Sequence, residues 1–128
     1  MEFERFVIDS NVFVALYSKA DSHHKEAYKV FRELESKALI VHPYVIQETA
    51  TVLAYKLGQK AAVKFLNDIE DAANIVVPLI DIRKEMASFI SIKKKISFTD
   101  AVLVGLAKTM SAKLITFDSQ MLALFKKA

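Results

Sequence analysis

The chain has 128 residues, 53% of them hydrophobic, and a formal net charge of +3. This composition can bury one core, so residues 1–128 are expected to form a single domain. Two glycines, two prolines and no cysteine disfavour a flexible linker and exclude disulfides and thiolate metal sites. No signal peptide or membrane-length apolar segment is visible, and a cytoplasmic location is expected. The positive charge is compatible with nucleic-acid binding, but a lysine-rich solvated surface explains it equally well.

Short apolar runs typical of strands alternate with segments of helical spacing along the chain. The predicted strands cover residues 3–8, 39–41, 74–78 and 113–116. Helices are predicted after Ser10, from Asp21-Ser22, from Pro43 to Gly58, from Gln59 to Asp71, from Asp81 to Lys95, from Ser97 and from Met121 to Phe125. In the helix from Asp81 to Lys95, Met86, Phe89 and Ile90 are expected to be buried. The alternation predicts an α/β fold with helices flanking a mainly parallel central sheet.

Four acidic residues stand where an apolar strand ends or where a helix begins. Asp9 follows the first predicted strand and Asp118 follows the last. Glu48 and Asp100 lie in the first turns of two predicted helices. Because ligands of α/β sheets bind beyond the carboxyl ends of the strands, these side chains are expected to meet at one edge of the sheet. They would repel one another there unless a divalent cation lay between them.

Each acid also has a purely structural explanation. Asp9 suits a turn, Asp118 suits the cap of the last helix, and Glu48 suits a solvated helix surface. Asp100 forms a Ser-x-x-Asp pattern with Ser97 that is close to a capping box. Capping and solvation account well for each residue taken alone. They account less well for the set, because all four acids stand inside or beside apolar segments.

A cluster of carboxylates binds Mg²⁺ or Mn²⁺ through oxygen and leaves water in the remaining positions. Such an ion lowers the pKa of a bound water, orients it, and offsets charge that develops on a phosphodiester oxygen. The pattern therefore favours a metal-dependent nuclease. Asn11, Thr99 and Thr116 are close to the acids in sequence and are expected to orient them or the substrate.

Several segments together resemble the PIN-domain family and, within it, the small VapC-type toxin ribonucleases. Besides the central Glu48, they are Val7-Ile8-Asp9-Ser10-Asn11, Ser97-Phe98-Thr99-Asp100-Ala101 and Leu114-Ile115-Thr116-Phe117-Asp118. The order and spacing of the four acids match the family, and the resemblance covers nearly the whole chain.

The resemblance implies that Asp9, Glu48, Asp100 and Asp118 form a nuclease centre that binds Mg²⁺ or Mn²⁺ and cleaves RNA. It also implies a parallel sheet flanked by helices, a homodimer and, for the toxin branch, a cognate antitoxin that occupies or distorts the site. Many relatives carry a further acid two places beyond the last aspartate, where this chain has Gln120. An amide brings no negative charge, so one metal ion is favoured over two.

Two other functions are compatible with parts of this pattern. A PIN-like domain could bind RNA or a protein partner without cutting, although four acids facing phosphates bring such a binder no benefit. An α/β phosphoryl-transfer domain would use an aspartate nucleophile. Such a domain usually has paired acids after its first strand and a lysine beyond its last strand. This chain has a lone Asp9 at the first of these places and Asp118 at the second.

Other polar residues suggest binding sites less strongly. His23 and His24 are adjacent, and adjacent side chains of a helix do not face the same way, so a solvated first turn is favoured over a metal-ligand pair. His42, between a strand and a proline, is expected in a turn or at the edge of the core. Lys93 to Lys95 are expected to be solvated, and they would contact phosphates if RNA binds.

Overall fold

Four short parallel strands form the centre of the protein. The computed structural model describes residues 3–127. Its sheet contains β1 (Arg5–Ile8), β2 (Ala38–Ile40), β3 (Ile75–Val76) and β4 (Lys113–Ile115), in the order β3-β2-β1-β4. All three strand pairings are parallel, and Val7 of β1 lies opposite Ile40 on one side and Leu114 on the other. The predicted α/β class with a mainly parallel sheet is confirmed.

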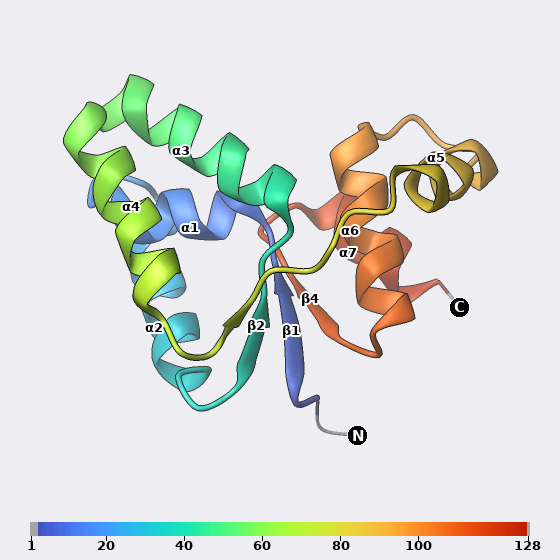
Figure 1. Ribbon diagram of the computed structural model, residues 1–128, viewed down its shortest axis with the longest axis horizontal. Coiled ribbons are helices and arrows are strands. Elements are labelled where there is room, and N and C mark those ends of the chain that lie inside the picture. Colours follow the sequence, from blue (N-terminus) through green and yellow to red (C-terminus); the bar gives the residue numbers. More distant parts are fainter. Residues whose placement is uncertain (1–2, 128) are drawn as a thin grey trace.

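Seven helices cover the two faces of the sheet within the described residues. They are α1 (Ser10–Tyr17), α2 (His24–Glu33), α3 (Pro43–Leu57), α4 (Gln59–Asp71), α5 (Ile82–Ser91), α6 (Phe98–Thr109) and α7 (Ser119–Lys126). Figure 1 shows α1 to α4 on one side of the strands and α5 to α7 on the other. No helix in residues 3–127 combines the length and apolar character that a membrane span requires.

The apolar runs of the inner strands follow from this two-sided cover. Phe6, Val7 and Ile8 of β1 are all buried, because a parallel sheet carries helices on both faces. The strand predicted over residues 74–78 is shorter, with only Ile75–Val76 in β3. β3 is an edge strand, and both Val76 and Val77 are exposed. Val76 and the following Val77 therefore belong to a surface rather than to the core.

An aromatic cluster holds α1, α2 and α4 together. The ring of Phe13 lies 5.2 Å from that of Phe31 and 5.3 Å from that of Phe65. Tyr17 meets Phe65 edge-on at 5.6 Å, and its hydroxyl donates a hydrogen bond to Asp68. These contacts fix α1 against its neighbours. They therefore also fix the strand end that immediately precedes α1.

The helix predicted from Asp81 to Lys95 differs from the structure in length and in burial. α5 ends at Ser91, so Lys93 to Lys95 lie in the connection to α6. Met86 is 48% exposed and Ile90 is 71% exposed, so their predicted burial is wrong. The physical reason is that α5 lies at the outside of the domain, packs mainly on α6 and buries none of its residues fully. A run of three lysines gains no packing energy by extending such a helix.

The start of the second helix also differs from the prediction. α2 begins at His24 rather than at Asp21-Ser22. The Asp21 carboxylate accepts the backbone N–H of His23 at 2.8 Å and closes a turn before the helix. The predicted stop at Gly58 is confirmed, and its φ of +103° is a conformation that favours glycine.

A set of polar contacts, which we call the α5 clasp, attaches α5 to the start of α3. His42 is 2% exposed and caps α3, and its Nδ1 accepts the backbone N–H of Tyr44 at 3.0 Å. Its Nε2 therefore carries the proton and donates to Glu85 at 2.6 Å. The Tyr44 hydroxyl donates to the other oxygen of Glu85 at 2.7 Å. His42 thus lies at the edge of the core, as predicted.

Loss of the Phe65 ring is expected to destabilise the fold strongly. Phe65 is fully buried between Phe13 and Tyr17. Phe65→Ala should lower the free energy of unfolding by about 3–5 kcal/mol, because it removes apolar burial and leaves a cavity. Urea denaturation followed by circular dichroism measures this change.

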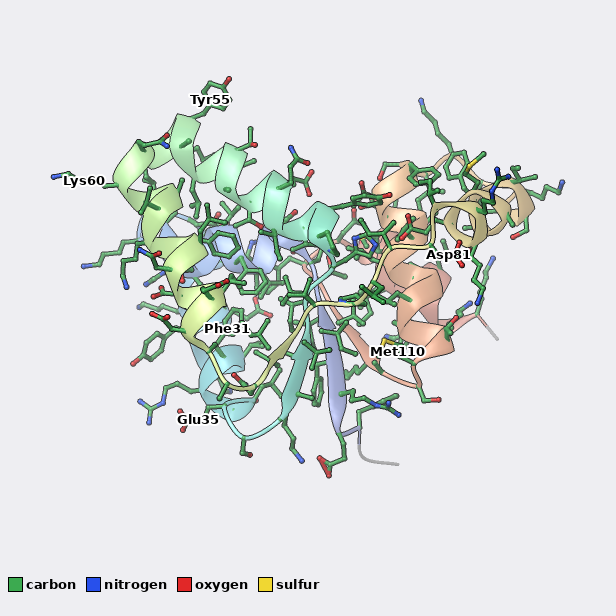
Figure 2. The ribbon with its side chains drawn as sticks, in the orientation of Figure 1. Phe31, Glu35, Tyr55, Lys60, Asp81 and Met110 are labelled. Atoms are coloured by element: carbon green, nitrogen blue, oxygen red, sulfur yellow. The ribbon has the colours of Figure 1, made fainter. Side chains whose placement is uncertain are left out.

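The matched control is Tyr55→Ala. Tyr55 is 88% exposed and points away from α3 into solvent in Figure 2. We expect this substitution to change stability by less than about 0.5 kcal/mol. Similar losses for the two variants would contradict the assignment of Phe65 to the centre of the core.

Candidate active site

Asp9 is the buried member of the predicted acidic set. It follows β1 directly and is 4% exposed. Its Oδ1 accepts the backbone N–H of Ser10 at 2.7 Å, and its Oδ2 accepts the hydroxyl of Thr116 at 2.7 Å. Its own backbone N–H donates to the carbonyl of Ile115 at 3.0 Å. Asp9 is therefore held at the point where β1 and β4 both end, as the topology predicts.

Thr116 links Asp9 to Asp118. Its hydroxyl oxygen accepts the backbone N–H of Asp118 at 3.0 Å and the amide of Asn11 at 3.1 Å, while its proton goes to Asp9. The Asn11 carbonyl oxygen accepts the backbone N–H of Phe117 at 3.2 Å. One hydroxyl offers one proton and two lone pairs, so this network is saturated. Asn11 and Thr116 thus contact the acidic residues or their backbone.

Thr99, the third residue expected to assist the acids, has a different environment. It lies half-buried in the first turn of α6, next to Asp100 in sequence. In the part of the chain that the structure describes, no hydrogen bond joins its side chain to the four acids. Its predicted role stays a prediction.

Glu48 reaches the site from α3, whereas the other acids follow a strand or start a helix. It lies in the second turn of α3 and is exposed, as a solvated glutamate would be. The hydroxyl of Ser10 donates to its Oε1 at 2.5 Å, however, and ties it to the start of α1. The helix predicted after Ser10 begins at Ser10 itself, and Asp9 is its cap. The polar Asp9-Ser10 pair was the only sequence signal for this contact.

Asp118 and Asp100 both lie at helix starts, where capping was the alternative explanation. Asp118 does cap α7, and its Oδ1 accepts the backbone N–H groups of Gln120 at 2.8 Å and Met121 at 3.1 Å. Ser97 caps α6 by accepting the backbone N–H of Asp100 at 3.0 Å. The capping role of Asp118 is confirmed, and its Oδ2 atom lies outside the cap. At α6 one half of the predicted capping box is confirmed, namely the hydrogen bond from the Asp100 backbone N–H to Ser97.

The four acids influence one another electrostatically. Burial raises the pKa of Asp9 from 3.8 to about 6, against the hydrogen bonds from Thr116 and Ser10, and the charges of Asp100 and Glu48 raise it further. Burial also raises the pKa of Asp100, and the charges of Asp118 and Glu48 act in the same direction. Within residues 3–127, no three acidic or histidine side chains converge closely enough to hold one metal ion. The residues form an electrostatic cluster rather than a closed coordination shell.

A cavity of about 680 Å³ opens next to this cluster. Asp100 and Asp118 line one part of it, and Lys94 and Lys95 line another. Cavities of this size commonly hold small molecules or single building blocks of a polymer. Acidic and basic groups thus share one depression.

The two adjacent histidines contact different parts of the molecule. The ring of His23 stacks on Phe117, with ring centres 4.3 Å apart and an interplanar angle of 12°. Nδ1 of His24 lies 2.8 Å from the carbonyl oxygen of Ala15. The two side chains therefore diverge, and His23 lies just before α2 rather than in its first turn.

The chain is a parallel α/β domain with acidic side chains at the carboxyl edge of its sheet, and this architecture defines the class of protein to which it is similar. The sequence profile of the PIN domain matches residues 6–127, so the chain belongs to the PIN-domain family. It is 30% identical over 122 residues to a VapC ribonuclease of Archaeoglobus fulgidus, a match that covers 89% of this chain and 77% of that protein. The crystal structure of Mycobacterium tuberculosis VapC20, a sarcin–ricin loop cleaving toxin, has the same fold, with a TM-score of 0.80 and 21% identity. That match covers 93% of this chain and 94% of VapC20.

The buried Asp9 carboxyl should make stability fall as pH rises through mildly acidic values. Its pKa of about 6 lies above the ordinary 3.8, so between these values the folded protein retains a proton that the unfolded chain has lost. The free energy of unfolding in EDTA should therefore decrease from about pH 4 to about pH 6, by ~1–3 kcal/mol. Asp9→Asn should flatten this part of the profile and be more stable than the wild type at neutral pH. Urea denaturation at several pH values measures both effects.

Asp71→Asn is the control for the pH profile. Asp71 is exposed at the end of α4 and is far from the acidic cluster in sequence. Its profile should follow that of the wild type. A wild-type slope retained in Asp9→Asn would show that Asp9 does not hold the extra proton.

Proposed function

We propose that the protein is a metal-dependent endoribonuclease that hydrolyses RNA phosphodiester bonds. The observation that supports this proposal is the acidic cluster, in which a buried Asp9 feels the charges of both Asp100 and Glu48. Deprotonating several acids at one sheet edge costs free energy, and a bound cation offsets that cost. Membership of the PIN family and the similarity to a VapC ribonuclease of Archaeoglobus fulgidus support the same reaction.

The donor set suits Mg²⁺ or Mn²⁺. Asp9, Glu48, Asp100 and Asp118 offer only carboxylate oxygens, and the chain has no cysteine. Bound there, the ion would activate water and offset charge on the phosphate oxygens during hydrolysis. Asp9 and Glu48 each already accept a hydrogen bond that limits their movement. The chain therefore partly orients its ligands before any ion binds.

In this proposal the residues of the chain have distinct tasks. Thr116 and Ser10 orient Asp9 and Glu48, respectively. Asp118 is fixed by its cap through Oδ1, which leaves Oδ2 available as a ligand. Water supplies the oxygen that joins phosphorus, and the displaced ribose oxygen takes up a proton as its bond to phosphorus breaks. Gln120 contributes no charge beside Asp118, and this favours one ion over two.

Cleavage of RNA tests the proposal directly. Purified protein with single-stranded RNA should produce fragments in Mg²⁺ or Mn²⁺ and none in EDTA. Asp9→Asn and Asp100→Asn should each lower the rate at least about 100-fold, because removing one electrostatic contribution to a transition state typically costs that much. Gel analysis of end-labelled RNA measures the rates.

Asp71→Asn again serves as the control and should cleave at the wild-type rate. Cleavage that survives both site substitutions and EDTA would eliminate the proposed centre. RNA binding without metal dependence and without cleavage would instead favour a PIN-like domain that binds RNA and does not cut it.

We also propose that the protein forms a homodimer through an apolar surface. The segment from β3 to α5 exposes a series of large hydrophobic side chains, here called the α5 patch: Val76, Val77, Leu79, Ile80, Ile82, Met86 and Ile90. Leu79 is 99% exposed, and single domains rarely leave so many neighbouring apolar groups uncovered. A second copy of the chain would cover this surface in a symmetric pair.

Substitutions in the α5 patch should dissociate such a dimer. Leu79→Lys combined with Ile90→Lys places charge in the proposed interface and should reduce the mass measured by light scattering from two chains to one chain of 14.4 kDa. Tyr55→Lys, at a site that is 88% exposed and outside the patch, should leave the mass unchanged. A wild-type protein that is monomeric at micromolar concentration would contradict the proposal.

The biological role proposed for this activity is that of the toxin in a toxin–antitoxin pair acting on cytoplasmic RNA. The support comes from the VapC ribonuclease of Archaeoglobus fulgidus and its 30% identity to this chain. The cognate antitoxin would occupy or distort the acidic site. A short open reading frame next to the gene, whose product inhibits cleavage, would support this role, and a gene with no such neighbour would favour RNA processing.

A further inference from the structure

The α5 clasp reaches the start of α3 one helical turn before Glu48. Tyr44 and Glu48 are four residues apart in α3, so their side chains lie on the same face of the helix. The Glu85 carboxylate accepts hydrogen bonds from His42 and Tyr44, at 2.6 and 2.7 Å, and its side chain is only 12% exposed. Hydrogen bonds to a charged acceptor are stronger than those between neutral groups. The clasp therefore holds the face of α3 that carries Glu48.

A row of aromatic rings continues from the clasp to the start of α6. The ring centre of Tyr44 lies 6.4 Å from that of Phe98, and the ring centre of Phe98 lies 5.4 Å from that of Phe89 in α5. Phe98 is the first residue of α6 and stands two places before Asp100. Glu85 and Phe89 are four residues apart, so one face of α5 contacts the starts of both α3 and α6. Two of the four acids thus follow closely on residues that share these contacts.

The helix α5 can support both helix starts because it packs closely on α6. A Cβ atom at Gly105 of α6 would lie 3.0 Å from the Ser88 hydroxyl of α5, so this close approach depends on glycine. Figure 1 shows α3 on the other side of the strands from α5 and α6. Within residues 3–127, the backbone of α3 packs little against either of these helices. Side chains at the helix starts therefore carry the connection between α3 and α6.

The distance between these two helix starts decides what the acids can hold. In residues 3–127, no three acidic or histidine side chains converge closely enough to surround one ion. Burial raises the pKa of Asp100, and the charges of Asp118 and Glu48 raise it further, so these carboxylates lie close enough to repel one another. Mg²⁺ needs oxygen atoms at about 2.0–2.1 Å in a nearly octahedral arrangement. A small change in the separation of α3 and α6 therefore decides whether Glu48 and Asp100 reach the same ion.

We propose that the α5 clasp and Phe98 are positioning residues, which fix the starts of α3 and α6 and so set the distance between the carboxylates of Glu48 and Asp100. This inference rests on the proposed metal-dependent function and adds to it residues that lie outside the acidic cluster. The clasp acts through the backbone of α3, and Phe98 acts through the first turn of α6. The carboxylates themselves remain the metal ligands.

Binding of Mn²⁺ in the absence of RNA tests this alignment separately from cleavage. Free Mn²⁺ is measured by electron paramagnetic resonance while the ion is titrated into the protein. Glu85→Ala removes both hydrogen bonds of the clasp and should weaken Mn²⁺ binding about 10-fold, at the lower end of the losses typical for residues that orient metal ligands. Tyr44→Phe keeps the aromatic ring and the bond from His42 to Glu85, so it should weaken binding less.

The matched controls are Asp68→Ala and Tyr17→Phe. The Asp68 carboxylate also accepts a tyrosine hydroxyl, from Tyr17, and its second partner is Lys64. It lies on α4, on the other side of the strands from α5 and α6. Both controls should bind Mn²⁺ like the wild type, although each loses stability in urea. Equal Mn²⁺ affinity in Glu85→Ala, Tyr44→Phe and their controls would overturn the proposal.

Amide hydrogen exchange in EDTA gives a readout that needs no metal ion. Relative to β1, residues 46–50 of α3 and 101–104 of α6 should exchange faster in Glu85→Ala than in the wild type, because local opening follows the loss of nearby contacts. Asp68→Ala should leave the exchange of these residues unchanged. Unchanged exchange in Glu85→Ala would reject the alignment, whatever the protein cleaves. Faster exchange in a protein that binds no Mn²⁺ would retain the alignment and reject the proposed metal-dependent ribonuclease.

Cleavage of RNA extends the test. At low Mn²⁺, Glu85→Ala should cleave more slowly than the wild type, and saturating Mn²⁺ should recover most of the rate with the KM for RNA unchanged. Asp68→Ala should show no such dependence on Mn²⁺. A loss of rate that excess Mn²⁺ does not recover would overturn the alignment. Mn²⁺ binding that depends on the clasp in a protein that cuts no RNA would retain the alignment and reject the ribonuclease.

Discussion

The burial of the Asp9 carboxyl at the ends of β1 and β4 is the constraint on which the rest of the site depends. Removing a carboxylate from water is costly, and the hydrogen bonds from Ser10 and Thr116 offset only part of that cost. Thr116 can donate to Asp9 only because β4 pairs with β1 in a register that places Ile8 opposite Ile115. The strand pairing, the aromatic packing beneath α1 and the network around Thr116 therefore all act on one carboxyl group.

Helix capping and the proposed chemistry use the same residues for compatible reasons. A helix start needs acceptors for its free N–H groups, and a metal site needs oxygen atoms that do not move. Asp118 provides one oxygen to α7, and its other oxygen is held in place as a result. The structural explanation of Asp118 as a helix cap is therefore correct. It does not compete with a functional role, because the second carboxylate oxygen of Asp118 lies outside the cap.

The sequence was sufficient for the features that depend on burial and chain direction. Apolar runs identified the strands, and parallel connections placed Asp9 and Asp118 at the same edge. The sequence was insufficient where a contact joins distant segments, as in the hydrogen bonds from Ser10 to Glu48 and from His42 to Glu85. Helical spacing indicates which face of a helix is apolar, but it does not indicate which segment covers that face. The exposure of Met86 and Ile90 has the same cause: their helix has an apolar face that the domain itself leaves uncovered. The PIN family was recognisable from residues near the strand ends, whereas the lysine-lined cavity required the folded chain.

The α5 clasp gives this peripheral helix an unusual position in the molecule. One face of α5 is tied through Glu85 to His42 and Tyr44 at the start of α3, and other parts of its surface are apolar and exposed. A helix moves as a rigid unit, and α3 is the element that carries Glu48. The hydrogen bonds of Glu85 therefore join α5 to the helix that carries Glu48. The exposed apolar surface of α5 and one acid of the site thus belong to two helices that share a polar attachment.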